Sequence, residues 1–211
     1  MRRYTLIVAI LLLVFCSCQK KDNTFPVITL QGTNPHVVVL ASDSIYADPG
    51  AVATDDMDGS LEITSAGLVD MFAAGNYSIT YTASDKSGNK TEATRKVIVD
   101  AGPFLSGNFT VDNFIGTTAD STYNDTISAP DTSTNVIFLK KFARIEQALV
   151  YATIEGVTLT VPSQTINCGN PAESKVFSGY GTFLNDTVFT IYYTVSNSNT
   201  EYSGYGVYTR N

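Results

Sequence analysis

From Pro26 onward the chain alternates apolar and polar residues, and this pattern predicts β-strands throughout. Val, Ile, Thr, Tyr and Phe fill the alternating positions, and Gly, Asn and Asp interrupt them at short intervals. No segment shows a convincing helical period. Residues 140–151 come nearest, and their β-branched and aromatic neighbours favour a strand. The predicted fold class is therefore all-β.

The first part of the pattern, residues 26–101, predicts a β-sandwich. Tyr77, Ile79, Tyr81 and Ala83 share one strand face by alternation and would line its core. Tyr77 also has the position of a tyrosine corner, in which the hydroxyl bonds to upstream backbone. The stretch Asp100-Ala101-Gly102-Pro103 is typical of a linker, so we expect this part to fold on its own.

The second part, residues 102–211, predicts an antiparallel barrel or half-barrel. Two hairpins are expected in it: 149–154 with 157–161 across Glu155-Gly156, and 179–184 with 188–195 across Asn185-Asp186. Both dipeptides suit tight turns with positive φ. Gly179 and Gly181 alternate in one strand and indicate tight curvature or a close neighbour.

Two polar stretches of the second part, residues 116–134 and 167–174, are expected to be irregular loops. Binding groups often collect on loops that a rigid scaffold positions, so any ligand or partner is expected to bind this part of the chain. The alternative is that both stretches are plain disordered connections.

The N-terminus predicts export and lipid anchoring. Arg2 and Arg3 precede an apolar run of ten residues, which suits a signal peptide and falls short of the roughly 20 residues that span a bilayer. Small Ser17 precedes Cys18 after this run and resembles a lipobox. The prediction is a signal peptide over 1–17, lipid on Cys18 and a polar tether over 18–25. An ordinary secretory signal and an uncleaved anchor are the alternatives.

Residues 26–101 also resemble a known family, the bacterial immunoglobulin-like (Ig-like) domain first described in a pesticidal crystal protein. The matching segments are Pro26-Val27-Ile28-Thr29-Leu30-Gln31-Gly32, Tyr46-Ala47-Asp48-Pro49-Gly50-Ala51, Asp55-Asp56-Met57-Asp58-Gly59, Gly75-Asn76-Tyr77-Ser78-Ile79-Thr80-Tyr81 and Asp85-Lys86-Ser87-Gly88-Asn89. The resemblance implies an Ig-like β-sandwich that acts as a spacer.

The second part resembles lipocalin-like domains of Bacteroidota lipoproteins. The resemblance rests on Val161-Pro162-Ser163-Gln164-Thr165-Ile166 and Phe177-Ser178-Gly179-Tyr180-Gly181-Thr182. The stretch Gln19-Lys20-Lys21-Asp22 is similar to the signal that sends such lipoproteins to the outside of the outer membrane. Together these resemblances imply a lipid-anchored protein of the outer membrane that is exposed at the cell surface.

Composition and motifs narrow the function classes. The formal net charge is −7 and no basic patch is visible, which argues against a nucleic-acid binder. With Cys16 removed and Cys18 lipidated, Cys168 has no cysteine to pair with, so no disulfide is expected. Neither a zinc motif nor a Walker loop, GxSxG or HExxH motif is present, and no cofactor is predicted.

Four features carry candidate chemistry. His36, the only histidine, would have to serve any catalytic triad, and we expect no catalytic role. Calcium could bind the acidic run Asp55–Asp58, but a solvated turn is preferred and no metal site is predicted. Cys168 is expected to be a small packed side chain. Six tyrosines could form a sugar-stacking site or pack in strands: Tyr180, Tyr192, Tyr193, Tyr202, Tyr205 and Tyr208.

The predicted function is that of a non-enzymatic, lipid-anchored cell-envelope protein. Its C-terminal β domain would bind a glycan or a protein in adhesion, with the membrane as a further partner through Cys18. Two alternatives remain: a carrier with a small molecule inside the barrel, and a hydrolase.

The spacing of the last three tyrosines limits any site they could form. Strict alternation is absent among Tyr202, Tyr205 and Tyr208, so they cannot all share one strand face.

Overall fold

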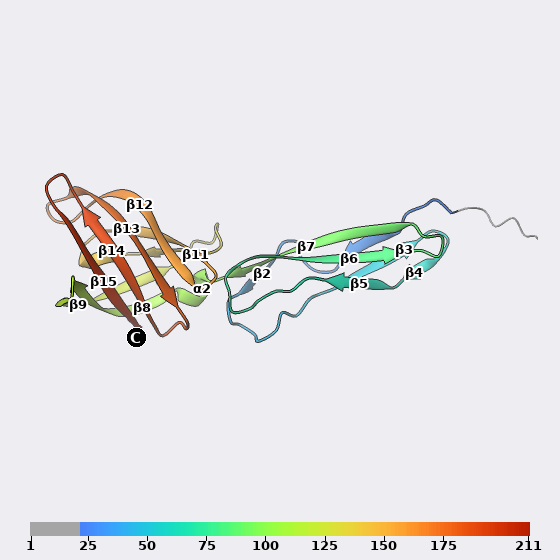
Figure 1. Ribbon diagram of the computed structural model, residues 1–211, viewed down its shortest axis with the longest axis horizontal. Coiled ribbons are helices and arrows are strands. Elements are labelled where there is room, and N and C mark those ends of the chain that lie inside the picture. The colour runs from blue at the N-terminus through green and yellow to red at the C-terminus, as the bar shows by residue number, and fades with distance from the viewer. Residues whose placement is uncertain (1–21) are drawn as a thin grey trace, which may run out of the picture. The chain divides into compact units, whose positions relative to one another are not determined.

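A computed structural model describes residues 22–211, and these residues form an all-β protein (Figure 1). The predicted fold class is confirmed. The predicted signal peptide, the lipidation site Cys18 and the tether up to residue 21 lie outside the described residues. In the described part of the chain, no helix has the length and apolar character needed to cross a membrane.

The chain divides into two compact units. Among the described residues, the first consists of residues 22–29 together with Ala51–Thr64 and Tyr81–Ala93, and the second of Leu30–Gly50, Ser65–Thr80 and Thr94–Asn211. The second unit holds the whole C-terminal barrel. The separate folding of residues 26–101 and 102–211 stays a prediction.

The Ig-like region contains seven strands in two sheets (Figure 1). The three-stranded sheet has the order β1-β3-β4, and the four-stranded sheet has the order β2-β7-β6-β5, in which β2 runs parallel to β7. The strand bounds are β1 Val27–Leu30, β2 His36–Val39, β3 Ala51–Asp55, β4 Gly59–Leu61, β5 Ile63–Ala66, β6 Gly75–Ser84 and β7 Lys90–Asp100.

Strand β6 carries the predicted core face. Ile79, Tyr81 and Ala83 are buried, as the alternation requires. The Tyr77 hydroxyl donates a hydrogen bond of 2.7 Å to the carbonyl of Ala73, which confirms the predicted tyrosine corner. Arg95 on β7 was not predicted as a core residue. It is fully buried because its guanidinium donates to backbone carbonyls, including that of Thr33 at 2.7 Å.

The C-terminal region is a closed antiparallel barrel of eight strands, which fits the lipocalin-like architecture expected from the sequence. Its order is β10-β11-β12-β13-β14-β15-β8-β9. The bounds are β8 Gly107–Ile115, β9 Thr118–Ser128, β10 Val136–Leu139, β11 Val150–Glu155, β12 Thr158–Cys168, β13 Glu173–Phe183, β14 Val188–Ser196 and β15 Glu201–Arg210. Both predicted hairpins are present, as β11-β12 and β13-β14.

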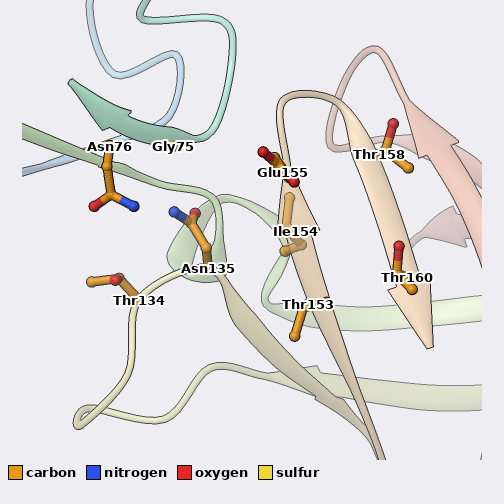
Figure 2. A pocket seen from close by; sticks show the side chains of 9 residues that line it. All are labelled: Gly75, Asn76, Thr134, Asn135, Thr153, Ile154, Glu155, Thr158 and Thr160. Atoms are coloured by element: carbon orange, nitrogen blue, oxygen red, sulfur yellow. The ribbon is translucent and has the colours of Figure 1, made fainter. Parts of the chain in front are cut away.

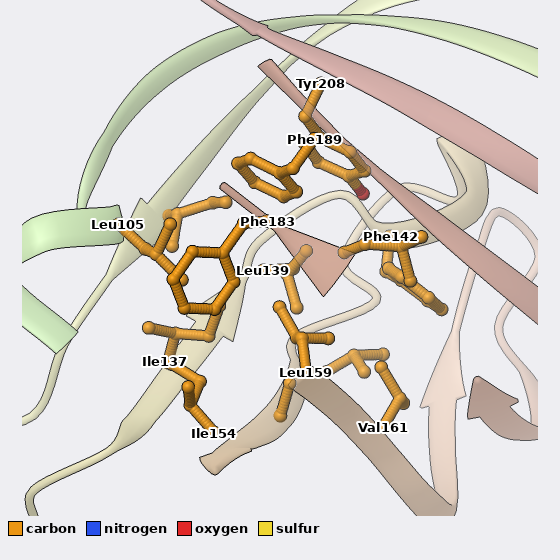
Figure 3. Close-up of a cluster of buried hydrophobic side chains, with 14 of the residues drawn as sticks. Leu105, Ile137, Leu139, Phe142, Ile154, Leu159, Val161, Phe183, Phe189 and Tyr208 are labelled. Carbon is orange, nitrogen blue, oxygen red and sulfur yellow. The ribbon is translucent and has the colours of Figure 1, made fainter. Parts of the chain in front are cut away.

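Apolar side chains fill the barrel interior (Figure 3). Phe189 stacks on Tyr208 with ring centroids 5.1 Å apart, and Phe142 meets Phe177 edge-on at 6.1 Å. The inner face of β14 is the predicted one, with Phe189 and Ile191 both buried. Because these rings occupy the space that a ligand would need, the barrel resembles a packed core more than a carrier's cavity.

Two short helical elements correct the sequence interpretation. The segment predicted as a linker holds the helix α2, Gly102–Leu105, whose Leu105 is fully buried. The segment 140–151, interpreted as a strand, instead contains a 3₁₀ turn at Phe142–Arg144 (η1), and β11 begins only at Val150. Burying Phe142 in the barrel favours this turn over the strand that its β-branched neighbours indicate.

The first predicted irregular loop is mostly strand, and the second is half strand with a turn at residues 169–172. Residues 116–134 contain β9, and residues 167–174 contain the end of β12 and the start of β13. Most polar residues of β9 face outward on a barrel that needs only one apolar face, with Asp125 as a buried exception, so polarity did not mean disorder. The Asn185-Asp186 turn also differs from its prediction. Neither residue has positive φ, and Asn185 Oδ1 instead accepts the backbone N–H groups of Thr187 and Val188 at 3.0 Å.

Candidate binding site on the barrel surface

Four aromatic side chains form a row across the outside of the barrel. Tyr180 pairs with Tyr192, Tyr192 with Tyr205, and Tyr205 with Phe114, on the neighbouring strands β13, β14, β15 and β8. Directly opposite residues in an antiparallel sheet point to the same face and lie close together. The strand register therefore brings together residues that lie far apart in the sequence. We name these four residues the aromatic row.

The rings of the aromatic row contact one another in sequence along it. Phe114 and Tyr205 are stacked at 4.6 Å and 7°, Tyr205 and Tyr192 lie 5.6 Å apart, and Tyr192 and Tyr180 are stacked at 5.4 Å. Phe114 and Tyr205 therefore cover each other's faces. Tyr192 is 47% exposed and Tyr180, at the end of the row, is 62% exposed. The accessible part of the row is this Tyr180–Tyr192 end.

A shallow cavity of about 470 Å³ lies beside that end of the row. Tyr180 and Tyr192 line it together with three short hydroxyl side chains on the outer face: Ser178, Thr194 and Ser203. The Thr194 and Ser203 hydroxyls are hydrogen-bonded at 3.0 Å. We name these three residues the hydroxyl shelf. Short side chains next to tall rings leave the surface hollowed, and every side chain of the shelf is an uncharged donor and acceptor.

The residues beneath the shelf are held rigidly. Tyr193 points inward, and its hydroxyl donates a buried hydrogen bond of 2.7 Å to Oδ1 of Asn113. Burial raises the pKa of Tyr193 to about 12, so this hydroxyl stays protonated at neutral pH. Gly179 and Gly204 also line the cavity. A Cβ on Gly179 would overlap the carbonyl oxygen of Tyr192, which confirms the close neighbour expected at this glycine.

The six tyrosines singled out in the sequence separate into two groups. Tyr193, Tyr202 and Tyr208 lie on inward-facing positions, and burial raises the pKa of Tyr208 well above its ordinary value. Tyr180, Tyr192 and Tyr205 face outward in the aromatic row. Sequence reasoning missed Phe114. The only signal that could have found it is the pairing of β8 with β15, which joins the two ends of the barrel sequence.

The other residues predicted as candidates lie apart from the aromatic row. His36 is in the Ig-like region, where its Nδ1 is hydrogen-bonded to the Tyr46 hydroxyl at 2.6 Å. Cys168 is fully buried at the end of β12, and burial raises the pKa of its thiol. A buried thiol with a raised pKa has little thiolate character, so Cys168 has the properties of a packing residue.

A larger cavity of about 690 Å³ lies in the same compact unit (Figure 2). Its lining is mostly threonine, asparagine and glycine, with one carboxylate, that of Glu155. Asn135 is fixed there, because its backbone N–H donates to Asp100 Oδ1 at 2.7 Å and its own Oδ1 accepts the N–H of Ala101 at 2.8 Å. No aromatic side chain lines this cavity, so it lacks the exposed tyrosine rings that distinguish the hollow beside the aromatic row.

Comparison with known proteins identifies a family match in the Ig-like region of the chain. A comparison with curated proteins gave no match. Among solved structures, a lipoprotein from Bacteroides thetaiotaomicron is similar, with 17% identity and a TM-score of 0.34 over 88% of this chain and 100% of that chain. Residues 28–99 match the family model of the Ig-like domain of bacterial surface proteins, and this match supports a protein of the bacterial cell envelope.

Proposed function

We propose that this protein is a non-enzymatic, lipid-anchored binding protein of the outer membrane, exposed at the cell surface. Its Ig-like region acts as a spacer and its barrel binds a glycan in adhesion. The observation that carries the proposal is the hollow bounded by the Tyr180–Tyr192 end of the aromatic row and by the hydroxyl shelf.

The chemistry of this hollow suits a neutral sugar. A sugar ring has C–H groups on its faces, which pack against the electron-rich face of a tyrosine ring. Its hydroxyl groups need partners that both donate and accept, and Ser178, Thr194 and Ser203 provide them. No charged side chain lines the hollow, so nothing in it selects an acidic or basic ligand.

The lining of the hollow disfavours a hydrolase, and the packing inside the barrel disfavours a carrier. A hydrolase that uses side-chain acid–base chemistry would need a carboxylate, histidine or thiol against its substrate, and none of these lines the hollow. A carrier would need space inside the barrel, where Phe142, Phe177, Phe189 and Tyr208 pack together. Of the three functions, glycan binding is the one that a specific surface supports.

A glycan array probed with the soluble chain, residues 19–211, tests the proposal. A glycan retained by the wild type should bind at least tenfold more weakly to the variant Tyr180→Ala with Tyr192→Ala. Tyr151→Ala is the matched control, since Tyr151 is 38% exposed on β11 and lies outside the row. The proposal is wrong if the double variant binds the glycan as well as the control does. Binding of a protein but of no glycan would also contradict it.

The lipid anchor has its own test. Cys18→Ser should block labelling by a fatty-acid analogue and release the protein from the membrane fraction, whereas Cys16→Ser should change neither. Several acyl chains on one cysteine hold a protein durably, which a single chain does not. Labelling that survives Cys18→Ser would reject this anchor. Protease treatment of intact cells then distinguishes exposure at the cell surface from an inward-facing position.

A further inference from the structure

We infer that three carboxylates of the Ig-like region, those of Asp22, Asp55 and Asp56, form a calcium site. One carboxylate oxygen from each residue lies within 4.8 Å of the others. Asp22 comes from the segment before β1, Asp55 is the last residue of β3, and Asp56 follows it in the turn to β4. All three belong to the same compact unit. We name them the carboxylate cluster.

Burial makes this cluster different from an ordinary acidic turn. Asp22 is 6% exposed and Asp55 is 8% exposed, so Asp55 is not the solvated turn residue that the sequence favoured. The Oδ2 atom of each has no hydrogen-bond partner among the described residues. A buried carboxylate oxygen that accepts no hydrogen bond is costly, and a bound cation removes that cost.

The other oxygens of these two carboxylates are already engaged. Asp22 Oδ1 accepts the backbone N–H of Thr24 at 2.9 Å. Asp55 Oδ1 accepts the N–H groups of Met57 and Asp58, both at 2.9 Å. These bonds hold both carboxylates in fixed orientations. The two Oδ2 atoms are therefore the ones left to bind a ligand.

Neighbouring carboxylates show how the fold otherwise provides partners for such groups. Asp58 forms an ion pair with Lys86 at 2.9 Å and also accepts the Lys86 backbone N–H. Asp85 accepts from the side chain of Asn89 at 2.6 Å. Within residues 22–211, no basic side chain pairs with the carboxylate cluster.

The donor set selects the cation. Three carboxylates offer only hard oxygen atoms, and no histidine or cysteine belongs to the cluster, which disfavours zinc and copper. Calcium accepts irregular sets of six to eight oxygens completed by water, whereas magnesium demands a near-ideal octahedron. A cluster with one exposed member, Asp56, leaves room for water ligands. Calcium is therefore the cation that fits.

The site would join two segments that are distant in sequence. A cation held by Asp22 and Asp55 ties the chain just after the predicted lipidated Cys18 to the β3–β4 turn. The side chain of Asn89, which lies 3.5 Å from the carbonyl oxygen of Asp22, adds a weak contact to the same segment. Calcium would then fix the connection between anchor and spacer.

Calorimetric titration of the chelator-treated soluble chain, residues 19–211, with calcium chloride tests the site. We expect one calcium ion per chain with an affinity of about 10⁻⁴–10⁻³ M, as in extracellular modules. Thermal unfolding in calcium should shift upward, because a ligand bound only to the native state stabilises it. No heat of binding and no shift at 10 mM calcium (about ten times the weakest expected dissociation constant) would overturn the inference. Equal affinity for magnesium would overturn the identity of the ion.

The substitution Asp55→Asn removes the charge and keeps an oxygen for the two backbone N–H groups, so the variant should fold. Its calcium affinity should fall at least tenfold, and Asp22→Asn, outside any strand, should act in the same direction. Asp58→Asn is the control in the same turn, and we expect its affinity to change less than threefold. Unchanged binding in both cluster variants, or an equal loss in the control, would contradict the assignment.

Discussion

The aromatic row and the carboxylate cluster are assembled in opposite ways. The row takes one residue from each of four barrel strands, and its contacts depend on the register of β8, β15, β14 and β13. The cluster takes two of its three members from adjacent positions, Asp55 and Asp56. A site made from strand residues is only as well ordered as the barrel beneath it, whereas a site made from a turn depends on local hydrogen bonds.

The aromatic row rests on the barrel core, so we expect the largest loss of stability when a core residue is truncated. Phe142 is fully buried and meets the rings of Phe177 and Tyr193, at 6.1 and 5.5 Å. Phe142→Ala should lower the free energy of unfolding by about 3–5 kcal/mol, since it removes an aromatic side chain and leaves a cavity. Urea unfolding measures this change.

The matched control is Phe72→Ala, because Phe72 is 58% exposed. It should change the free energy of unfolding by less than about 0.5 kcal/mol. A loss below about 1 kcal/mol in Phe142→Ala would mean that the barrel interior is loosely filled. That result would mean that the aromatic row does not rest on a well-packed core, and it would restore the carrier as an alternative.

The next largest expected effect is a change of stability with pH, which a buried carboxylate in the barrel should cause. Burial raises the pKa of Asp125 to about 6, although its Oδ1 accepts the backbone N–H groups of Thr126, Lys140 and Lys141. The native state therefore binds more protons than the unfolded chain between pH 4 and 6, and its stability falls as the pH rises through this window. From the size of the pKa change, the fall is about 3 kcal/mol.

Asp125→Asn cannot ionise and should lose that part of the pH dependence, which urea unfolding at pH 4, 5, 6 and 7 detects. Asp112→Asn, on the exposed face of the neighbouring strand β8, should keep the wild-type slope. Equal slopes in the wild type and Asp125→Asn would show that Asp125 ionises normally in the folded barrel.

In the Ig-like region, Tyr77→Phe should lower the stability by a smaller amount. The substitution removes only the hydroxyl that bonds to the Ala73 carbonyl at 2.7 Å. The free energy of unfolding should fall by about 1 kcal/mol, the usual contribution of one such bond. Thermal or urea unfolding measures it, with Tyr151→Phe as the control. If both variants lose equally little, the tyrosine corner contributes nothing.

Local signals in the sequence were enough for much of the fold. The alternation at Tyr77, Ile79 and Tyr81 predicted a buried face, and the Glu155-Gly156 turn predicted its hairpin. In both cases the information lies within a few residues. The polar stretch now assigned to β9 was misread as a loop because outward-facing strand residues on a barrel are as polar as loop residues.

The aromatic row could be predicted only in part. Alternation separated Tyr205 from Tyr202 and Tyr208, but it could not say which residues of other strands lie beside Tyr205. That neighbour is Phe114, paired through the contact of β15 with β8. The same limit hid the carboxylate cluster, because Asp22 lies far from Asp55 in sequence and nothing in the turn itself indicates its burial.

The most direct test of the central claim is an NMR titration of ring-labelled tyrosines with a glycan retained on the array. We expect the resonances of Tyr180 and Tyr192 to change most and that of Tyr205 to change less, whereas those of buried Tyr208 and of Tyr77 in the Ig-like region should not change. Changes centred on Tyr77, or on tyrosines inside the barrel, would contradict the assignment of the aromatic row as the binding surface.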